Sequence, residues 1–337
     1  MTRLLIIGSF QPTHMGAHFA HAAQALGLEH STIDSARATS SSRWIHSVYW
    51  HLFDRRPMYL AQFSEMVLEA CKQFQPSILL VTGLTPPNDR ILREIRQSGI
   101  KCVNYLTDDP WNPVVRRIWF SKALREYDIV FNPRKANLRQ LEEIVPRVVY
   151  LPFGFAPEVH FVEPPPPGLR EHYACDVFFY GGADNDRRPY INALIDAGVN
   201  VQLCGGYWNR RRKTRPFYRG MANAQDLRYG SSAAKLTLCL VRRSNRDGHV
   251  MRTFKAPAMG AALLMEDTMD HRALFGDDDY AVSYFSTPET LVKKTKLLLN
   301  NSAHLDLMRQ RARDLIVNGA NSYHHRLQEI VAHVELM

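Results

Sequence analysis

CDVFFYGGADNDRRPYINALIDAG, residues 175–198, decides how the second half of the chain folds. It begins with a short apolar run that ends in two glycines, which is typical of a buried parallel strand followed by a tight turn. It continues with apolar residues at helical spacing and ends at Gly198, a helix stop signal. A strand, a turn and a helix in this order form the repeating unit of a parallel sheet covered by helices.

The same unit recurs along the whole chain. In the first half we expect strands at RLLIIGS (3–9), SILLVTG (77–83), YDIVFN (127–132) and RVVYLPFG (147–154), with a serine-rich loop at residues 40–42. The segment KCVNYLTDDPW (101–111) contains a further strand, which ends in two aspartates and a proline. In the second half the further strands are NVQLCGG (200–206), KLTLCLV (235–241), GAALLME (260–266) and a short one at 280–284. Helical patterns separate these runs, so the sequence predicts an α/β protein with doubly wound parallel sheets.

A run of four prolines and a glycine, residues 164–168, separates the two halves. Such a run is stiff and extended, and it enters neither a helix nor a central strand. The sequence therefore predicts two Rossmann-like domains, one at residues 1–163 and the other at 169–320.

Composition excludes several other classes of protein. The chain has 337 residues, of which 45% are hydrophobic and 22% charged, and no run of 18 apolar residues that would span a membrane. The apolar run at the N-terminus is too short for a signal peptide. The five cysteines are scattered, without the spacing of a disulfide framework or of a metal site. We expect a cytoplasmic protein that needs neither a metal nor a cofactor.

The net charge of +9 is concentrated in part at residues 210–219, which contain five arginines and one lysine. A solvated loop is one interpretation of this segment. Another is peripheral contact with an anionic membrane surface or with an acidic substrate. Nucleic acid is disfavoured as a partner, because no recognised nucleic-acid-binding module surrounds the segment.

In parallel sheets, ligands bind where loops follow the carboxyl ends of the strands. At the first such loop of the second half, Gly181 and Gly182 allow a phosphate to approach the backbone, and Arg188 opens the next helix. The alternative is a tight turn with surface arginines. At a later loop, Arg243 and Arg252 belong to a cluster of cations that predicts an anion site.

In the first half, the loops after two strands supply the candidate catalytic groups. Gly8 and Ser9 follow one strand, and Asp108 and Asp109 follow another. A carboxylate at this edge can take a proton from an acceptor hydroxyl, as a general base does. Alternatively, the aspartates cap the turn into the next proline. His14 is a second candidate base, although a lone histidine in a loop is more often structural.

Several segments together resemble a known family. RTFKAPAMGAALLMED (252–267) resembles the donor-binding segment of retaining GT-B glycosyltransferases. More closely, the chain is similar to the glycosyltransferase-like family that is named after the spore-maturation protein CgeB. The segments that carry this similarity are VNYLTDDPW, YDIVFNPRKANLRQL, VVYLPFGFAPEVH, DVFFYGGADNDRRPYINAL and YHHRLQEI.

The resemblance implies a GT-B fold, in which two Rossmann-like domains face a cleft and residues 321–337 pack back on the first domain. It implies a hexosyltransferase that moves a sugar from a nucleotide-diphosphate donor, such as a UDP- or GDP-sugar, to a hydroxyl acceptor without a metal ion. The acceptor itself is unknown. The donor residues that the resemblance implies are Gly181, Gly182, Arg188, Arg243, Asp247, Arg252, Glu266, Asp267 and Thr268.

The chain departs from the family pattern at one position. Retaining GT-B enzymes commonly place two glutamates eight residues apart, and here these positions hold Asp247 and Lys255. A protonated Lys255 cannot accept a hydrogen bond from a ribose hydroxyl, although it can meet a phosphate. The departure leaves an alternative function open, a non-catalytic nucleotide- or sugar-binding or surface-assembly protein that retains the fold.

Overall fold

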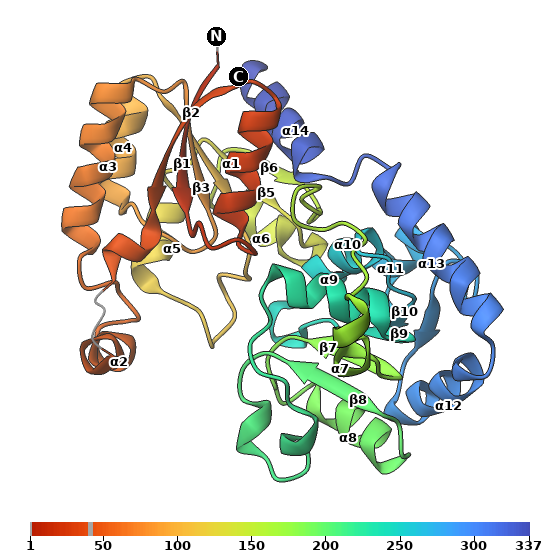
Figure 1. Ribbon diagram of the computed structural model, residues 1–337. Coiled ribbons are helices and arrows are strands. Elements are labelled where there is room, and N and C mark those ends of the chain that lie inside the picture. The colour runs from red at the N-terminus through yellow and green to blue at the C-terminus, as the bar shows by residue number, and fades with distance from the viewer. Residues whose placement is uncertain (1, 40–42) are drawn as a thin grey trace. The chain divides into compact units, whose positions relative to one another are not determined.

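The computed structural model describes residues 2–39 and 43–337, so the loop expected at residues 40–42 lies outside the described part (Figure 1). The chain forms two compact units. The first unit comprises Met1–Pro152, Ser244–Arg246 and Tyr323–Met337, and the second comprises Phe153–Arg243 and Asp247–Ser322. The polyproline run lies within the second unit, where Pro167 begins a short 3-10 helix, η3 (Pro167–Leu169).

The first unit is built on a parallel sheet of six strands in the order β2-β1-β3-β4-β5-β6. The strands are β1 (Arg3–Gly8), β2 (Glu29–Asp34), β3 (Ile78–Thr82), β4 (Lys101–Tyr105), β5 (Ile129–Asn132) and β6 (Val148–Tyr150). The helices are α1 (Met15–Ala25), η1 (Ser35–Ala38), α2 (Arg43–Leu52), α3 (Leu60–Phe74), α4 (Asp89–Gln97), α5 (Ile118–Leu124), η2 (Lys135–Asn137), α6 (Leu138–Glu142) and α14 (Tyr323–Glu335).

Strand β2 has no counterpart among the strands expected from the sequence. It lies at the edge of the sheet, and Ile33 is its one buried residue. The central strands are apolar because helices cover both of their faces, whereas an edge strand exposed to water tolerates polar residues. Its sequence, EHSTID, therefore has no apolar run that would predict a strand.

Two glycines allow α1 to pack closely against the end of β1. A Cβ atom at Gly8 would overlap the hydroxyl of Thr82, and one at Gly16 would lie 2.7 Å from the carbonyl oxygen of Ser9. The C-terminal helix α14 lies beside α1 (Figure 1), and the ring of Tyr323 stacks on that of His18 with 5.1 Å between the centroids. The last helix of the chain thus completes the first unit.

The second unit is built on a parallel sheet of five strands in the order β11-β10-β9-β7-β8. The strands are β7 (Val177–Tyr180), β8 (Val201–Cys204), β9 (Leu236–Cys239), β10 (Leu263–Glu266) and β11 (Ser283–Phe285). The helices besides η3 are α7 (Arg170–Tyr173), α8 (Arg188–Asp196), η4 (Trp208–Arg210), η5 (Arg215–Phe217), α9 (Ala224–Ala233), α10 (Met251–Ala258), α11 (Met269–Phe275), α12 (Pro288–Leu299) and α13 (Ser302–Val317). The short helix η6 (Arg243–Asn245) begins with the last residue of this stretch of the second unit and continues into residues of the first. The two doubly wound parallel sheets confirm the fold class that the sequence predicts.

Three further features concern the cysteines, membrane-spanning helices and groups of metal ligands. All five cysteines are buried and unpaired, and burial raises the pKa of the Cys71 thiol to about 12. Within the described residues, no helix combines the length and the apolar character needed to cross a membrane. The same residues contain no group of three or more His, Cys, Asp or Glu placed to hold a metal ion.

Candidate nucleotide-binding site

The site in the second unit centres on the glycine turn that follows β7. Gly181 has a φ angle of +148°, a region that favours glycine. A Cβ atom at this position would lie 2.7 Å from Nη2 of Arg252 and 3.3 Å from Nη1 of Arg187. The absence of a side chain therefore lets two guanidinium groups approach the backbone at the carboxyl end of the strand.

Two different helices supply these arginines. Arg187 is the residue that precedes α8, and Arg252 lies in the first turn of α10. The aromatic residues at the end of β7 support both of them. The guanidinium carbons lie 5.8 Å (Arg187) and 4.4 Å (Arg252) from the ring centroid of Phe179, and that of Arg252 lies 4.6 Å from the ring of Tyr180. Guanidinium groups stack favourably on aromatic faces.

Both arginines are buried, with 7% (Arg187) and 6% (Arg252) of their surface exposed. Burial, followed by the charge of Arg252, lowers the pKa of Arg187 to about 10. Asp184 lies nearby, with one carboxylate oxygen 3.2 Å from Nη1 of Arg187 and 3.3 Å from Nε of Arg242. One carboxylate is thus shared by two arginines, and the site keeps an excess of positive charge.

Three buried nitrogens of the two arginines also lack acceptors among the described residues. Nε of Arg187, and Nε and Nη1 of Arg252, make no hydrogen bond within the part of the chain that the structure describes. An unsatisfied buried donor costs about 1–3 kcal/mol, and more when it is charged. An anion on the glycine turn would satisfy these donors and neutralise the excess charge.

Lys255 lies three residues after Arg252 on α10 and is 5% exposed. Burial lowers the pKa of this amine to about 8. Its charge also acts on His160, whose pKa lies well below 6.5, chiefly because of burial and then because of Lys255. Asp247 favours the charged form of Arg187 and so lies within electrostatic range of it.

The predicted residues after β10 divide into two kinds. Glu266 presents its carboxylate at the strand end, where it accepts hydrogen bonds from the backbone N–H of Val241 (3.2 Å) and from Nη2 of Arg243 (3.0 Å). Asp267 instead forms two hydrogen bonds of 2.7 Å with Arg272, which lower the pKa of its carboxyl. The carboxylate of Glu266 is thus hydrogen-bonded to an arginine of the connection between β9 and α10, residues 240–250, which we call the cationic loop, and that of Asp267 to an arginine of α11.

The structure places Arg188 apart from the glycine turn. Its guanidinium donates to the side chain of Asn185, and it lines a hollow of about 610 Å³ together with Arg211, Arg212 and Lys213. Its neighbour Arg187, which the sequence did not single out, occupies the position against Gly181. Adjacent residues point about 100° apart around a helix, and sequence alone did not show which of the two faces inward.

The candidate catalytic residues belong to the first unit. Asp109 is 1% exposed, and both of its oxygens accept hydrogen bonds from Arg246, at 2.6 and 3.1 Å. Asp108 is partly exposed and accepts hydrogen bonds from Asn245 (3.1 Å) and from the hydroxyl of Thr107 (3.2 Å). The carboxylate of Asp108 is thus the more accessible of the two.

His14 and Ser9 lie at the end of β1. His14 is exposed and precedes the first residue of α1, without a side-chain capping bond to that helix. Ser9 is partly exposed, and its carbonyl oxygen contacts Gly16. Both residues lie at the carboxyl edge of the first sheet, on which Asp108 also lies.

Comparison with known proteins agrees with this architecture. Residues 187–332 match a family model described as glycosyl transferase-like. Sucrose-phosphate synthase from Thermosynechococcus elongatus matches with a TM-score of 0.70 and 13% identity, over 100% of this chain and 99% of that chain. An alpha-glucosyltransferase in complex with UDP and a 13-mer DNA matches with a TM-score of 0.69 and 13% identity, over 99% and 100%. No curated protein matches the sequence.

A putative UDP-N-acetylglucosamine 2-epimerase from Listeria monocytogenes also matches, with a TM-score of 0.58 and 15% identity over 91% of this chain and 90% of that one. At such identities, a structural likeness establishes the fold alone. The chain therefore has the GT-B fold, as the resemblance implied, and residues 187–332 are similar to a glycosyl transferase-like domain.

Proposed function

We propose that the protein is a glycosyltransferase that holds the diphosphate of a nucleotide-sugar, such as a UDP- or GDP-sugar, at the turn formed by Gly181 and Gly182. The observation that carries this proposal is the pair of buried arginines beside Gly181, Arg187 and Arg252, which have three buried nitrogens without acceptors among the described residues. Arginine binds phosphate through two parallel hydrogen bonds, which suits a diphosphate. The resemblance to the CgeB-like family agrees with this proposal.

In the proposed reaction, a hydroxyl oxygen of the acceptor forms a bond to the anomeric carbon of the sugar. The bond from that carbon to the diphosphate oxygen breaks, and negative charge develops on the diphosphate. Arg187, Arg252 and protonated Lys255 would stabilise this charge without a metal ion. Asp108 would accept the proton of the acceptor hydroxyl, because its carboxylate is the more accessible of the two aspartates.

The remaining predicted residues would bind the sugar and the nucleoside. Glu266 and Asp247 carry carboxylates that can accept hydrogen bonds from hydroxyl groups. Arg243 would position Glu266 through their 3.0 Å hydrogen bond. In this proposal Asp267 and Thr268 stabilise the cationic loop and the start of α11.

A second candidate function is nucleotide binding without turnover. The buried Lys255 favours it, since this amine occupies a position where the resemblance leads one to expect a glutamate. Incubation with UDP-glucose and GDP-mannose separates the two functions. Release of UDP or GDP, with or without an acceptor, supports the transferase. Tight binding with no release over hours supports the second candidate.

The site itself is tested by calorimetric titration of UDP, GDP and ADP. We expect Arg252→Ala and Arg187→Ala each to weaken binding of the preferred nucleotide by about 10- to 100-fold, because each removes charged hydrogen bonds to phosphate. Arg313→Ala is the matched control, since it removes an exposed arginine from α13 of the same unit. Circular dichroism shows whether each variant is folded.

The titration also distinguishes the two neighbouring arginines. The sequence points to Arg188 and the geometry to Arg187, so Arg187→Ala should cost more affinity than Arg188→Ala. If no nucleotide binds, or if folded Arg252→Ala binds as tightly as Arg313→Ala, the proposed site is wrong.

A further inference from the structure

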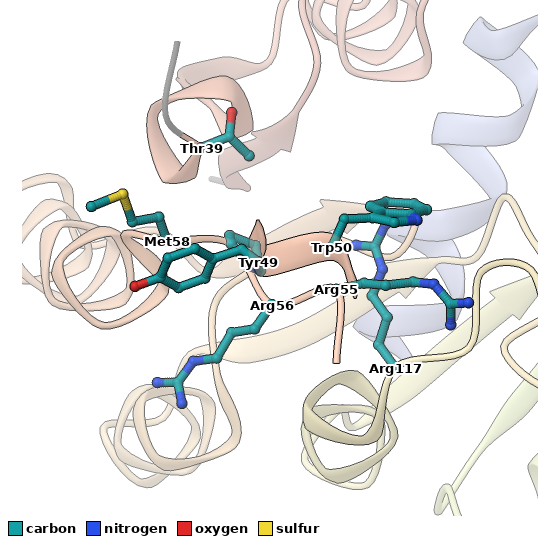
Figure 2. A pocket seen from close by; sticks show the side chains of 8 residues that line it. Thr39, Tyr49, Trp50, Arg55, Arg56, Met58 and Arg117 are labelled. Atoms are coloured by element: carbon teal, nitrogen blue, oxygen red, sulfur yellow. The ribbon is translucent and has the colours of Figure 1, made fainter. Parts of the chain in front are cut away.

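A second cluster of arginines lies in the first unit, at the carboxyl edge of its sheet. The connection from β2 to α3 contains Tyr49, Trp50, Arg55 and Arg56, and the connection from β4 to α5 ends with Arg117. These residues line a pocket with a volume of about 60 Å³ (Figure 2). Loops that follow the carboxyl ends of parallel strands are where such sheets bind ligands.

Arg55 and Arg117 share one aromatic support. Their guanidinium carbons lie 5.5 Å (Arg55) and 5.7 Å (Arg117) from the ring centroid of Trp50. Figure 2 shows both side chains beside this ring, whereas Arg56 extends away from them. The connection after β4 thus brings Arg117 next to a residue that lies more than sixty positions earlier in the chain.

Backbone carbonyls hold the two guanidinium groups without neutralising them. Nη1 of Arg55 donates to the carbonyl oxygen of Arg116 (2.7 Å), and Nη1 of Arg117 donates to that of Leu84 (2.8 Å). Nε is buried in both side chains and makes no hydrogen bond to any residue that the structure describes. Two arginines, each held by a backbone carbonyl and each with an unused Nε–H donor, therefore line one pocket.

Nearby carboxylates offset part of this charge. Asp54 accepts hydrogen bonds from the backbone N–H groups of Ile118 (2.5 Å) and Trp119 (3.3 Å), which directs its carboxylate to the start of α5. Burial has the largest effect on the pKa of Arg117 and lowers it, the charge of Asp108 comes next and raises it, and the charges of Arg55 and Asp54 then lower and raise it. The pocket remains cationic, because its lining includes three arginines and no acidic residue among those described.

The backbone that presents Arg55 is strained. Asp54 and Arg55 have φ angles of +52° and +53°, in the left-handed region that residues with a side chain rarely adopt. Each such residue costs about 1 kcal/mol or more, and strain of this kind concentrates at binding sites. Here the strained turn brings the side chain of Arg55 onto Trp50.

The size of the pocket limits what fits inside it. One water molecule needs about 10–15 Å³ of such space, so about 60 Å³ has room for roughly four to six oxygen-sized atoms. A phosphate group has this size, and a sugar ring with its hydroxyl groups does not. Tyr49 lines the pocket, and its ring stacks on that of Phe53, which is 52% exposed, with 4.9 Å between the centroids. Apolar surface thus continues from Tyr49 to an exposed ring.

We propose that this pocket binds the phosphate group of the acceptor, so that the acceptor is a phosphate-bearing molecule whose ring or chain lies on the adjoining apolar surface. The acceptor role rests on the proposed function, whereas the phosphate site does not. The phosphate is held and not transferred. A separate hydroxyl of the acceptor forms the new bond to the sugar as the nucleotide diphosphate leaves.

The first test is calorimetric titration of the full chain with glucose 6-phosphate, glucose and inorganic phosphate. We expect the two phosphates to bind and glucose not to bind. Arg55→Gln and Arg117→Gln should each weaken phosphate binding by about tenfold or more, since each removes a charged donor. Arg125→Gln, at an exposed arginine of the same unit outside the pocket, should leave binding within about twofold.

A second arm distinguishes the source of the phosphate. If the ligand is a phospholipid headgroup, phosphatidylglycerol vesicles bind the protein and Arg55→Gln weakens that binding, while glucose 6-phosphate does not bind. If the ligand is a soluble sugar phosphate, glucose 6-phosphate binding is the one that Arg55→Gln weakens. Both results support the pocket as a phosphate site.

UDP titration of the same variants separates this inference from the proposed function. Folded variants should keep UDP affinity, because the nucleotide site lies in the second unit. If UDP fails to bind but phosphate binding depends on Arg55, the result supports the phosphate site and contradicts the proposal that its ligand is the acceptor. If no phosphate probe binds, or if Arg125→Gln weakens binding as much as Arg55→Gln, the inference is overturned. If Arg117→Gln does not fold, the phosphate affinity of Arg55→Gln alone shows whether the pocket binds phosphate.

Discussion

Arg252 and Lys255 lie close to one helical turn apart on α10, and both are buried. Burial lowers the pKa of the Lys255 amine to about 8. The positive charge that Lys255 gives to the proposed diphosphate site therefore depends on pH.

We expect the affinity for UDP to fall as the pH rises through 8. Lys255 is mostly charged at pH 7 and mostly neutral at pH 9, so its charge is present below the folded pKa and lost above it. If only the charged form binds UDP, affinity falls about tenfold between these pH values. His160 stays neutral and Arg187, with a pKa of about 10, stays mostly charged over this range. Calorimetry at pH 7, 8 and 9 measures the change.

Two variants control this experiment. Lys255→Arg keeps the charge and should make UDP affinity independent of pH over the same range. Lys255→Met removes the charge and should bind UDP more weakly at pH 7. Its UDP affinity should also not change with pH over this range. A slope in Lys255→Met equal to that of the natural protein would show that another group titrates.

At the scale of elements, hydrogen bonds at the start of α11 hold the cationic loop next to the end of β10. Thr268 precedes this helix, and its hydroxyl accepts from the N–H of His271 (3.1 Å) and donates to the carbonyl oxygen of Gly248 (2.6 Å). Burial lowers the pKa of His271 to about 4, so its imidazole is neutral at pH 7. It can therefore donate to the carbonyl oxygen of Glu266 (2.7 Å) and accept from the hydroxyl of Thr253 (3.0 Å).

Thr268→Val should destabilise the protein by about 1–2 kcal/mol, because it removes the helix cap and leaves the Gly248 carbonyl without its hydroxyl partner. Urea unfolding followed by circular dichroism measures this change. Thr268→Ser retains the hydroxyl and should restore most of the lost stability. Equal stability of the valine and serine variants would show that the two hydrogen bonds contribute little.

At the scale of the whole molecule, the net charge of +9 favours anionic partners. The basic segment at residues 210–219 contributes Arg211, Arg212 and Lys213 to the hollow that Arg188 also lines. Contact of this segment with an anionic membrane surface is one of the interpretations that the sequence leaves open, beside a solvated loop and contact with an acidic substrate. Such contact is worth about 1 kcal/mol for each lysine or arginine near the surface.

The double variant Arg211→Gln/Arg212→Gln should therefore bind phosphatidylglycerol vesicles about 30-fold more weakly than the natural protein. Vesicle flotation at 50 and 200 mM salt measures this, and binding by the natural protein should weaken at the higher salt because charges are screened. Arg139→Gln/Arg313→Gln removes the same charge from exposed positions elsewhere. If this control loses as much affinity, net charge and not the segment attracts the membrane.

The sequence by itself determined the order and type of most elements, because buried central strands need apolar runs and glycine turns that can be read directly. It also directed attention to Gly181 and Arg252 as part of the proposed nucleotide-binding site, since both belong to connections that follow strand ends. The edge strand β2 was missed because its exposed residues are polar.

Only the tertiary structure decided which charged side chains are buried together. It placed Arg187, and not Arg188, against Gly181, and it paired Asp109 with Arg246 from a distant loop. It also joined Arg55 and Arg117 on the ring of Trp50. Burial and proximity arise when segments distant in the chain pack together, and no local spacing of residues encodes them.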